Sequence, residues 1–149
     1  METRRKIAQR VRHQAELWAV NNCRVNPATL NRACAVASAA LALRFIAEGY
    51  RASIVVMDGS KEGHCFVYSG GKVYDLTATQ FWNVARVHTP RNFVNYGKKV
   101  VRRCGHNPWF RHFSTNQVKS FQFLPLLEDW TIPPTEQNIN AILSCPAYD

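Results

Sequence analysis

The sequence predicts a single α+β domain of 149 residues, in which one buried helix packs on a small antiparallel sheet. Three observations support this fold class. The stretch from Asn31 to Tyr50 is rich in Ala and Leu and has no Gly or Pro before Gly49, which favours a helix. Three short apolar runs separated by turn residues follow it, as is typical of strands. With 46% apolar and 19% charged residues the chain can bury a core, which excludes disorder and a coiled coil.

The first half of the chain yields two helices and three strands. Residues 4–20 form an amphipathic helix, because apolar side chains repeat there at helical spacing: Ile7, Val11, Ala15 and Trp18. Asn31 is predicted to cap the second helix, which places Cys34 in its first turn. Strands are predicted over residues 52–57, 64–69 and 72–76, and Gly70-Gly71 forms the hairpin turn that joins the last two.

The second half is basic and less regular. No acidic residue occurs between Leu76 and Leu127. Val100-Val101 and Phe121–Leu124 are predicted as strands that complete the sheet, and Thr135 as the N-cap of a last helix through Leu143. We therefore expect one domain over residues 1–149. An N-terminal helix lies in residues 1–25, a candidate catalytic core in residues 31–81, and a basic sheet extension with a C-terminal helix in residues 82–149.

The charge of the chain favours anionic partners. Its 19 basic and 10 acidic residues give a net charge of +9. Residues 86–119 carry many of these basic side chains and are interleaved with Phe93, Tyr96, Trp109 and Phe110, a mixture that suits phosphate contacts and base stacking. A non-catalytic binding module for nucleic acid or an acidic protein is therefore one reading. No helix-turn-helix, RNP or KH signature occurs, so nucleic acid is not the favoured partner.

Cysteine usage and hydropathy indicate a reducing, aqueous compartment. The five cysteines are scattered and odd in number, unlike a secreted disulfide framework. No apolar run reaches the ~18 residues of a membrane helix. The basic start lacks the apolar region of a signal peptide, because Gln9, Arg10 and His13 occupy its place. We expect a cytoplasmic protein or one delivered into a target cell's cytoplasm, and its small basic chain would suit an effector or a phage protein.

Three residues are placed for nucleophilic catalysis: Cys34, His64 and Asp75. The thiolate is the reactive form of cysteine, and the N–H groups and dipole at a helix N-terminus stabilise it. A neighbouring imidazole stabilises it further and later passes a proton to the leaving group. A carboxylate on the other imidazole nitrogen fixes the orientation of the ring. We therefore predict Cys34 as nucleophile, His64 as general base and acid, and Asp75 as the residue that orients His64.

The predicted hairpin brings two of these residues together. With Gly70-Gly71 as the turn, Ser69 pairs with Lys72, and Asp75 lies opposite Phe66. His64 and Asp75 then lie diagonally on one face, within reach of a hydrogen bond. Cys65 points to the opposite face and is predicted to belong to the core.

The segments around these residues also carry a family resemblance. They are Ala33-Cys34-Ala35-Val36-Ala37, Gly49-Tyr50-Arg51-Ala52-Ser53-Ile54-Val55-Val56, Gly63-His64-Cys65-Phe66-Val67 and Val73-Tyr74-Asp75-Leu76-Thr77. Together they resemble the transglutaminase-like branch of the papain-like cysteine enzymes, over residues 31–81. The resemblance implies a helix bearing the cysteine, packed on a small antiparallel sheet. It also implies acyl transfer at an amide or thioester: peptide cleavage, deamidation or transfer to an amine. The substrate would be a protein or peptide amide, and the basic charge would suit an acidic one.

Other residues near the site are assigned less specifically. The Cys34 N–H is a natural oxyanion donor, and Asn26 or Asn31 could supply a second one. Thr77 or Thr79 is expected to cap a short turn, and Gln80 is a weaker candidate for substrate binding.

A zinc site is the rival use of cysteine and histidine in this chain. Cys104 and His106 form a close pair, with His112, Cys23 and Cys145 elsewhere. These spacings do not supply the four ligands of a structural zinc site, so we expect no metal and no cofactor.

Overall fold

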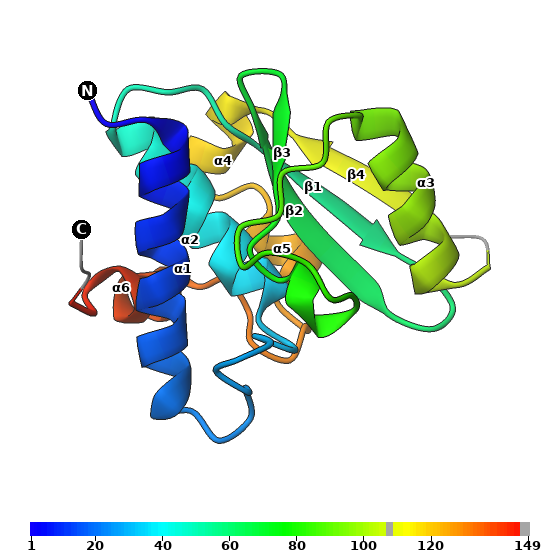
Figure 1. Cartoon of the computed structure of the whole chain (residues 1–149), viewed down its shortest axis with the longest axis horizontal. Coiled ribbons are helices and arrows are strands. Elements are labelled where there is room, and N and C mark those ends of the chain that lie inside the picture. Colours follow the sequence, from blue (N-terminus) through cyan, green and yellow to red (C-terminus); the bar gives the residue numbers. More distant parts are fainter. Residues whose placement is uncertain (107–108, 147–149) are drawn as a thin grey trace.

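A four-stranded antiparallel sheet with helices on both faces forms the centre of the protein (Figure 1). The computed structural model describes residues 1–106 and 109–146. The strands lie in the order β3-β2-β1-β4 and have these bounds: β1 Ser53–Asp58, β2 Gly63–Ser69, β3 Lys72–Tyr74 and β4 Trp109–Phe113. The predicted α+β class is confirmed.

Most helices cover one face of this sheet. α2 (Cys34–Ala47) packs on the strands, and α1 (Arg4–Val20) and α6 (Glu136–Leu143) pack on α2. α3 (Phe93–Cys104) lies on the other side of the sheet (Figure 1). Three short elements complete the described chain: η1 Ala78–Gln80, α4 Thr115–Lys119 and α5 Leu124–Leu127.

Alternation along the strands divides the buried side chains between two cores. Ile54 and Val56 of β1 pack in the large core that contains α1 and α2, whereas Val55 and Met57 pack beneath α3. Successive side chains of a strand point to opposite faces, so a nearly continuous apolar strand serves both cores. β1 therefore holds the two layers of helices together.

Several predicted elements are confirmed. α1 has the predicted bounds, and Ile7, Val11 and Ala15 are buried along it. The hairpin has the predicted register, with Ser69 opposite Lys72. Thr135 caps α6 through a hydrogen bond that the Asn138 N–H donates to its hydroxyl at 3.1 Å.

The start of α2 differs from the prediction. The helix begins at Cys34 with Ala33 as its N-cap, and Asn31 is not the cap. The side chain of Asn31 instead accepts a hydrogen bond from the Asn26 N–H at 2.8 Å. Leu30 and Arg32 have left-handed φ values of 53° and 67°, which prevent a helix from extending back to residue 31.

The two strands predicted in the basic half are wrong. Val100-Val101 lies inside α3, because buried Tyr96, Val100 and Cys104 repeat every four residues, which is a helical spacing. Residues 121–124 form a turn and the first residue of α5. The fourth strand is β4, whose Phe113 lies opposite Ile54 of β1.

None of the described helices has the length and apolar character needed to cross a membrane.

Candidate active site

Cys34 occupies the first position of α2 and faces the sheet. The left-handed residues Leu30 and Arg32 turn the chain sharply before it. Strained residues of this kind persist where the surrounding structure enforces them, and they cluster at functional sites. The thiol is almost buried, with 5% of Cys34 exposed. The first turn of a helix has N–H groups without intrahelical acceptors, and both these groups and the helix dipole favour a thiolate at this position.

His64 and Asp75 meet as the hairpin register predicts. His64 Nε2 lies 2.6 Å from Asp75 Oδ2, and both residues are fully buried. Asp75 follows β3 and forms a single bridge with His88, in which the Asp75 N–H donates to the His88 carbonyl at 2.9 Å. This bridge fixes the backbone of Asp75 directly after the end of β3.

Two further donors hold the Asp75 carboxylate. The Thr77 N–H donates to Oδ1 at 2.9 Å, and the Tyr96 hydroxyl donates to Oδ2, the oxygen that also faces His64. Thr77 stands at the start of η1, but its side chain does not cap that turn. Tyr96 comes from α3, which packs on the same face of the sheet as Phe66. The sequence prediction had treated Tyr96 only as part of the basic, aromatic segment.

The buried groups perturb one another's pKa values toward an ion pair. A hydrogen bond from the Cys65 thiol, followed by a hydrogen bond and the charge of His64, lowers the pKa of Cys34 to about 5, against burial, which opposes ionisation. Burial acts to lower the pKa of His64, but the charge and hydrogen bond of Asp75 outweigh it and raise that pKa to about 10. Burial likewise acts to raise the pKa of Asp75, yet His64 holds it below its ordinary value. Near neutral pH the site therefore contains a thiolate, an imidazolium and a carboxylate.

Cys65 has a role that the sequence prediction missed. It is fully buried in the core between sheet and α2, as predicted from strand alternation. On that face it also meets the N-terminus of α2, where its thiol stabilises the Cys34 thiolate and so lowers the pKa of Cys34. Burial and the neighbouring thiolate raise the pKa of Cys65, so Cys65 remains the protonated donor of the pair. Strand alternation predicts that Cys65 is buried, but no pattern in the sequence identifies Cys34 as its neighbour.

A cleft of about 310 Å³ opens beside Cys34. Its walls come from the start of α2, the β1–β2 hairpin, η1 and the segment after α5, and its lining residues are Arg32, Cys34, Asp58, Glu62, Gly63, Gln80, Asp129, Trp130 and Thr131. The side-chain Nε2 of Gln80 lies 3.4 Å from His64 Nδ1. Asn26 and Asn31, the sequence candidates for an oxyanion donor, do not belong to this lining.

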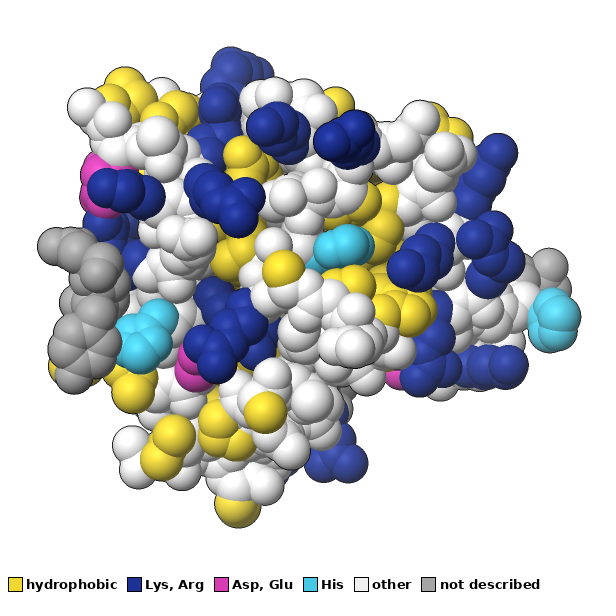
Figure 2. Space-filling model, in the orientation of Figure 1, with side chains coloured by type: hydrophobic (Ala, Val, Ile, Leu, Met, Phe, Trp, Pro, Cys, Tyr) yellow, Lys and Arg dark blue, Asp and Glu magenta, His cyan; other side chains and the backbone are white. Residues whose placement is uncertain are grey.

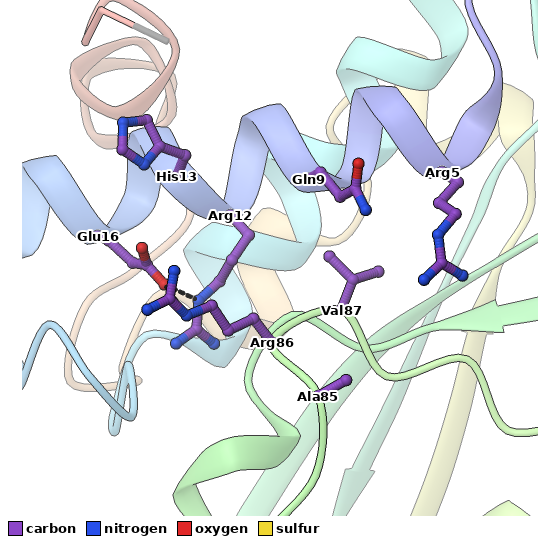
Figure 3. Close-up of a pocket in the computed structure, with 8 residues that line it drawn as sticks. All are labelled: Arg5, Gln9, Arg12, His13, Glu16, Ala85, Arg86 and Val87. Carbon is purple, nitrogen blue, oxygen red and sulfur yellow. Dashed lines mark hydrogen bonds and ion pairs between the residues drawn. The ribbon is translucent and has the colours of Figure 1, made fainter. Parts of the chain in front are cut away.

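A buried arginine ties together the two segments that carry the site. Arg12 of α1 is 1% exposed and donates to the Leu76 carbonyl at 2.5 Å and to the Ala28 carbonyl at 2.8 Å. Its Nε donates to Glu16 at 2.8 Å, the bond drawn in Figure 3. The segment before Cys34 and the segment after Asp75 are thereby held at a fixed separation. Arg12 does not belong to the apolar repeat of α1, and its burial is compensated because its guanidinium donates to two loop carbonyls.

The residues considered for zinc do not gather. Cys104 is buried in the core beneath α3, and the His106 N–H donates to the Ser60 hydroxyl at 2.9 Å. Within the described part of the chain, no three His, Cys, Asp or Glu side chains form a group that could hold a metal ion.

Comparison of the chain with protein-family models, with curated proteins and with solved structures finds no match.

Proposed function

We propose that this protein is a cysteine-dependent acyl-transfer enzyme acting on an amide, built on a papain-like core of the transglutaminase-like type. The observation that carries the proposal is the buried contact of 2.6 Å between His64 and Asp75, with Cys34 at a cleft and near enough to the same imidazole for each to shift the pKa of the other. The order Cys, His, Asp along the chain and their placement on a helix and an antiparallel hairpin match the resemblance found over residues 31–81.

The first half-reaction forms an acyl-enzyme. The Cys34 thiolate attacks the amide carbonyl, so a C–S bond forms while the carbonyl π electrons move to oxygen. When the tetrahedral intermediate collapses, the C–N bond breaks, and the His64 imidazolium gives its proton to the departing amine. The products are a thioester on Cys34, a neutral imidazole and a free amine or ammonia.

The second half-reaction returns the enzyme to its starting state. Neutral His64 takes a proton from water or from a second amine as that nucleophile attacks the thioester. The C–S bond then breaks, and the thiolate and imidazolium re-form. Asp75 keeps the ring oriented throughout and stabilises its positive charge, and Tyr96 and the Thr77 N–H hold Asp75 in place.

Gln80 is the side chain best placed to stabilise the oxyanion together with the Cys34 N–H. In the imidazolium form, Nδ1 of His64 carries a proton and cannot accept a hydrogen bond from Gln80 Nε2. The Gln80 amide lines the cleft and is then available as a donor to the oxygen of the substrate. All five cysteines are free, which supports a reducing compartment, where thiols persist and disulfides are rare. We place the protein in a cytoplasm, its own or that of a cell into which it is delivered.

An activated ester tests the proposal without knowledge of the substrate. With p-nitrophenyl acetate, the wild-type chain should release a burst of nitrophenolate and gain one acetyl group on Cys34, detected by mass spectrometry and removed by hydroxylamine. Cys34→Ala should lose the burst, whereas Cys23→Ala, at an exposed cysteine, should keep it. A burst of equal size in Cys34→Ala would show that Cys34 is not the nucleophile.

A binding role for the basic surface is the second candidate. Lys98, Arg102 and Arg103 are exposed on α3, and Figure 2 shows basic side chains gathered at that end of the molecule. Two aromatic residues of β4, Trp109 and Phe110, follow α3 in the sequence and have exposed fractions of 41% and 51%. Such a surface predicts salt-sensitive binding of an acidic protein or a nucleic acid, which Lys98→Glu should weaken and Cys34→Ala should not.

A further inference from the structure

The cleft at Cys34 has an acidic wall on a basic protein. Asp58, Glu62 and Asp129 line it, whereas Arg32 supplies its one lining guanidinium among the described residues. The whole chain has only 10 acidic residues against 19 basic ones, so three of the ten gather at this cleft. The local sign of charge is therefore opposite to the net charge of +9.

Two of these carboxylates remain available for a ligand. Glu62 forms an ion pair with Arg103 at 2.8 Å. In the described part of the structure, no basic side chain forms an ion pair with Asp58 or Asp129. The negative charge of Asp58 acts within the site: together with burial, which has the larger effect, it raises the pKa of Cys65. Asp129 is exposed at the mouth.

Trp130 gives the cleft an aromatic wall next to these carboxylates. Its ring packs on Gly63, where a Cβ atom would come within 2.6 Å of the ring, so only glycine leaves room for the tryptophan there. Gly63 directly precedes His64, and Trp130 lines the same cleft as Cys34. The face of an indole attracts a cation and also covers the alkyl stem of a long basic side chain.

We propose that this cleft holds a positively charged side chain of the substrate, that of lysine or arginine, next to the amide on which Cys34 acts. The proposal rests on the function proposed above and adds the substrate class. Asp58 and Asp129 bind the charge, and Trp130 covers the stem. The cationic group is held and not consumed, because the only bonds that change are those of the acyl transfer. Arg32 and the His64 imidazolium oppose the attraction, so the acidic wall must outweigh them.

Charged thiol reagents measure this balance at Cys34 itself. Two ethyl methanethiosulfonates, one with a trimethylammonium group and one with a sulfonate group, are reacted with the protein, and Cys34 modification is timed by peptide mass spectrometry. The ratio of the cationic to the anionic rate is divided by the same ratio for 2-mercaptoethanol. We expect a normalised ratio of about 10 at Cys34. Asp129→Asn should lower it by about threefold, since one carboxylate in the same cleft changes the two rates in opposite directions.

Arg32→Asn is the matched control at the same cleft, because asparagine tolerates the left-handed backbone of that position. It should raise the ratio by a similar factor. A normalised ratio at or below 1, or a ratio that Asp129→Asn leaves unchanged, would overturn the proposal. Neutral iodoacetamide separates this result from a failure of the proposed function. If Cys34 reacts with iodoacetamide at about pH 6 no faster than it does in the unfolded chain, the thiolate itself is absent, whatever the charge ratio.

Discussion

Replacing Cys65 with alanine should shift the pH dependence of Cys34 alkylation in a way that a merely structural change would not. The Cys65 thiol is the main cause of the low pKa of Cys34, about 5 in the folded protein. A hydrogen bond to a charged group contributes about 2 kcal/mol, and each pKa unit corresponds to about 1.4 kcal/mol. Cys65→Ala should therefore raise the pKa of Cys34 to roughly 6.5, while His64 still keeps it below the value of ~8.5 for a free cysteine.

The thiolate of Cys34 is the form that reacts, so its pKa determines how the alkylation rate changes at acid and at alkaline pH. Because the pKa of Cys34 is lowered, the thiolate persists as pH falls and is lost only near pH 5. At about pH 5.5 the thiolate fraction should fall from about three quarters to about one tenth in Cys65→Ala. A more basic thiolate is also a better nucleophile, so the alkylation rate above about pH 8 should rise by about fivefold.

The assay is the second-order rate of iodoacetamide addition at Cys34, followed by peptide mass spectrometry from acid to mild alkali. Cys23→Ala serves as control and should leave both midpoint and plateau unchanged. A midpoint that stays near pH 5 in Cys65→Ala would refute the role of the Cys65 thiol. A wild-type midpoint equal to that of the unfolded chain would refute the ion pair with His64.

Substitutions at three further residues test the groups around Cys34 and Cys65. Asp75→Asn should reduce turnover of an acyl substrate by about 10²- to 10⁴-fold and lower the pKa of His64 from about 10, which an NMR titration of the imidazole would follow; an unchanged titration would contradict the assigned contact. Tyr96→Phe should cost about 2 kcal/mol in urea unfolding and raise the pKa of Asp75, whereas full stability would mean that the hydroxyl does not hold the carboxylate. Arg12→Met should lower the free energy of unfolding by about 3 kcal/mol or more, because the carbonyls of Leu76 and Ala28 lose a buried donor. Arg12→Lys should recover part of this loss. Equal stability of both variants and the wild type would show that Arg12 does not hold the two segments together.

The contacts of the site that the sequence predicts are those set by a short segment of chain. A two-glycine turn fixes the hairpin register, and the register fixes which residues share a face, so the contact between His64 and Asp75 follows from the sequence. The position of Cys34 at the start of a helix also follows, although the helix begins three residues later than Asn31. A turn that uses left-handed Leu30 and Arg32 leaves no composition signal, because neither residue type favours that conformation.

The remaining parts of the site depend on contacts between distant segments. Tyr96 reaches Asp75 from α3, 21 positions further along the sequence, and Arg12 reaches Leu76 across 64 positions. β4 was missed because most of its residues are exposed at an edge of the sheet, which removes the alternation that identifies a half-buried strand. No single window of the sequence contains these relations, so only the folded chain reveals them.

The packing of Trp130 on Gly63 brings the C-terminal half of the chain to the candidate site. Residues 31–81 contain all three predicted catalytic side chains. They do not include Tyr96, which hydrogen-bonds to Asp75, or Trp130, which packs on Gly63 and lines the cleft. A fragment limited to residues 1–81 would possess the sulfur, the imidazole and the carboxylate, yet would lack the groups that enclose them. If the proposed function holds, a complete site therefore requires the C-terminal half of the chain as well as residues 31–81.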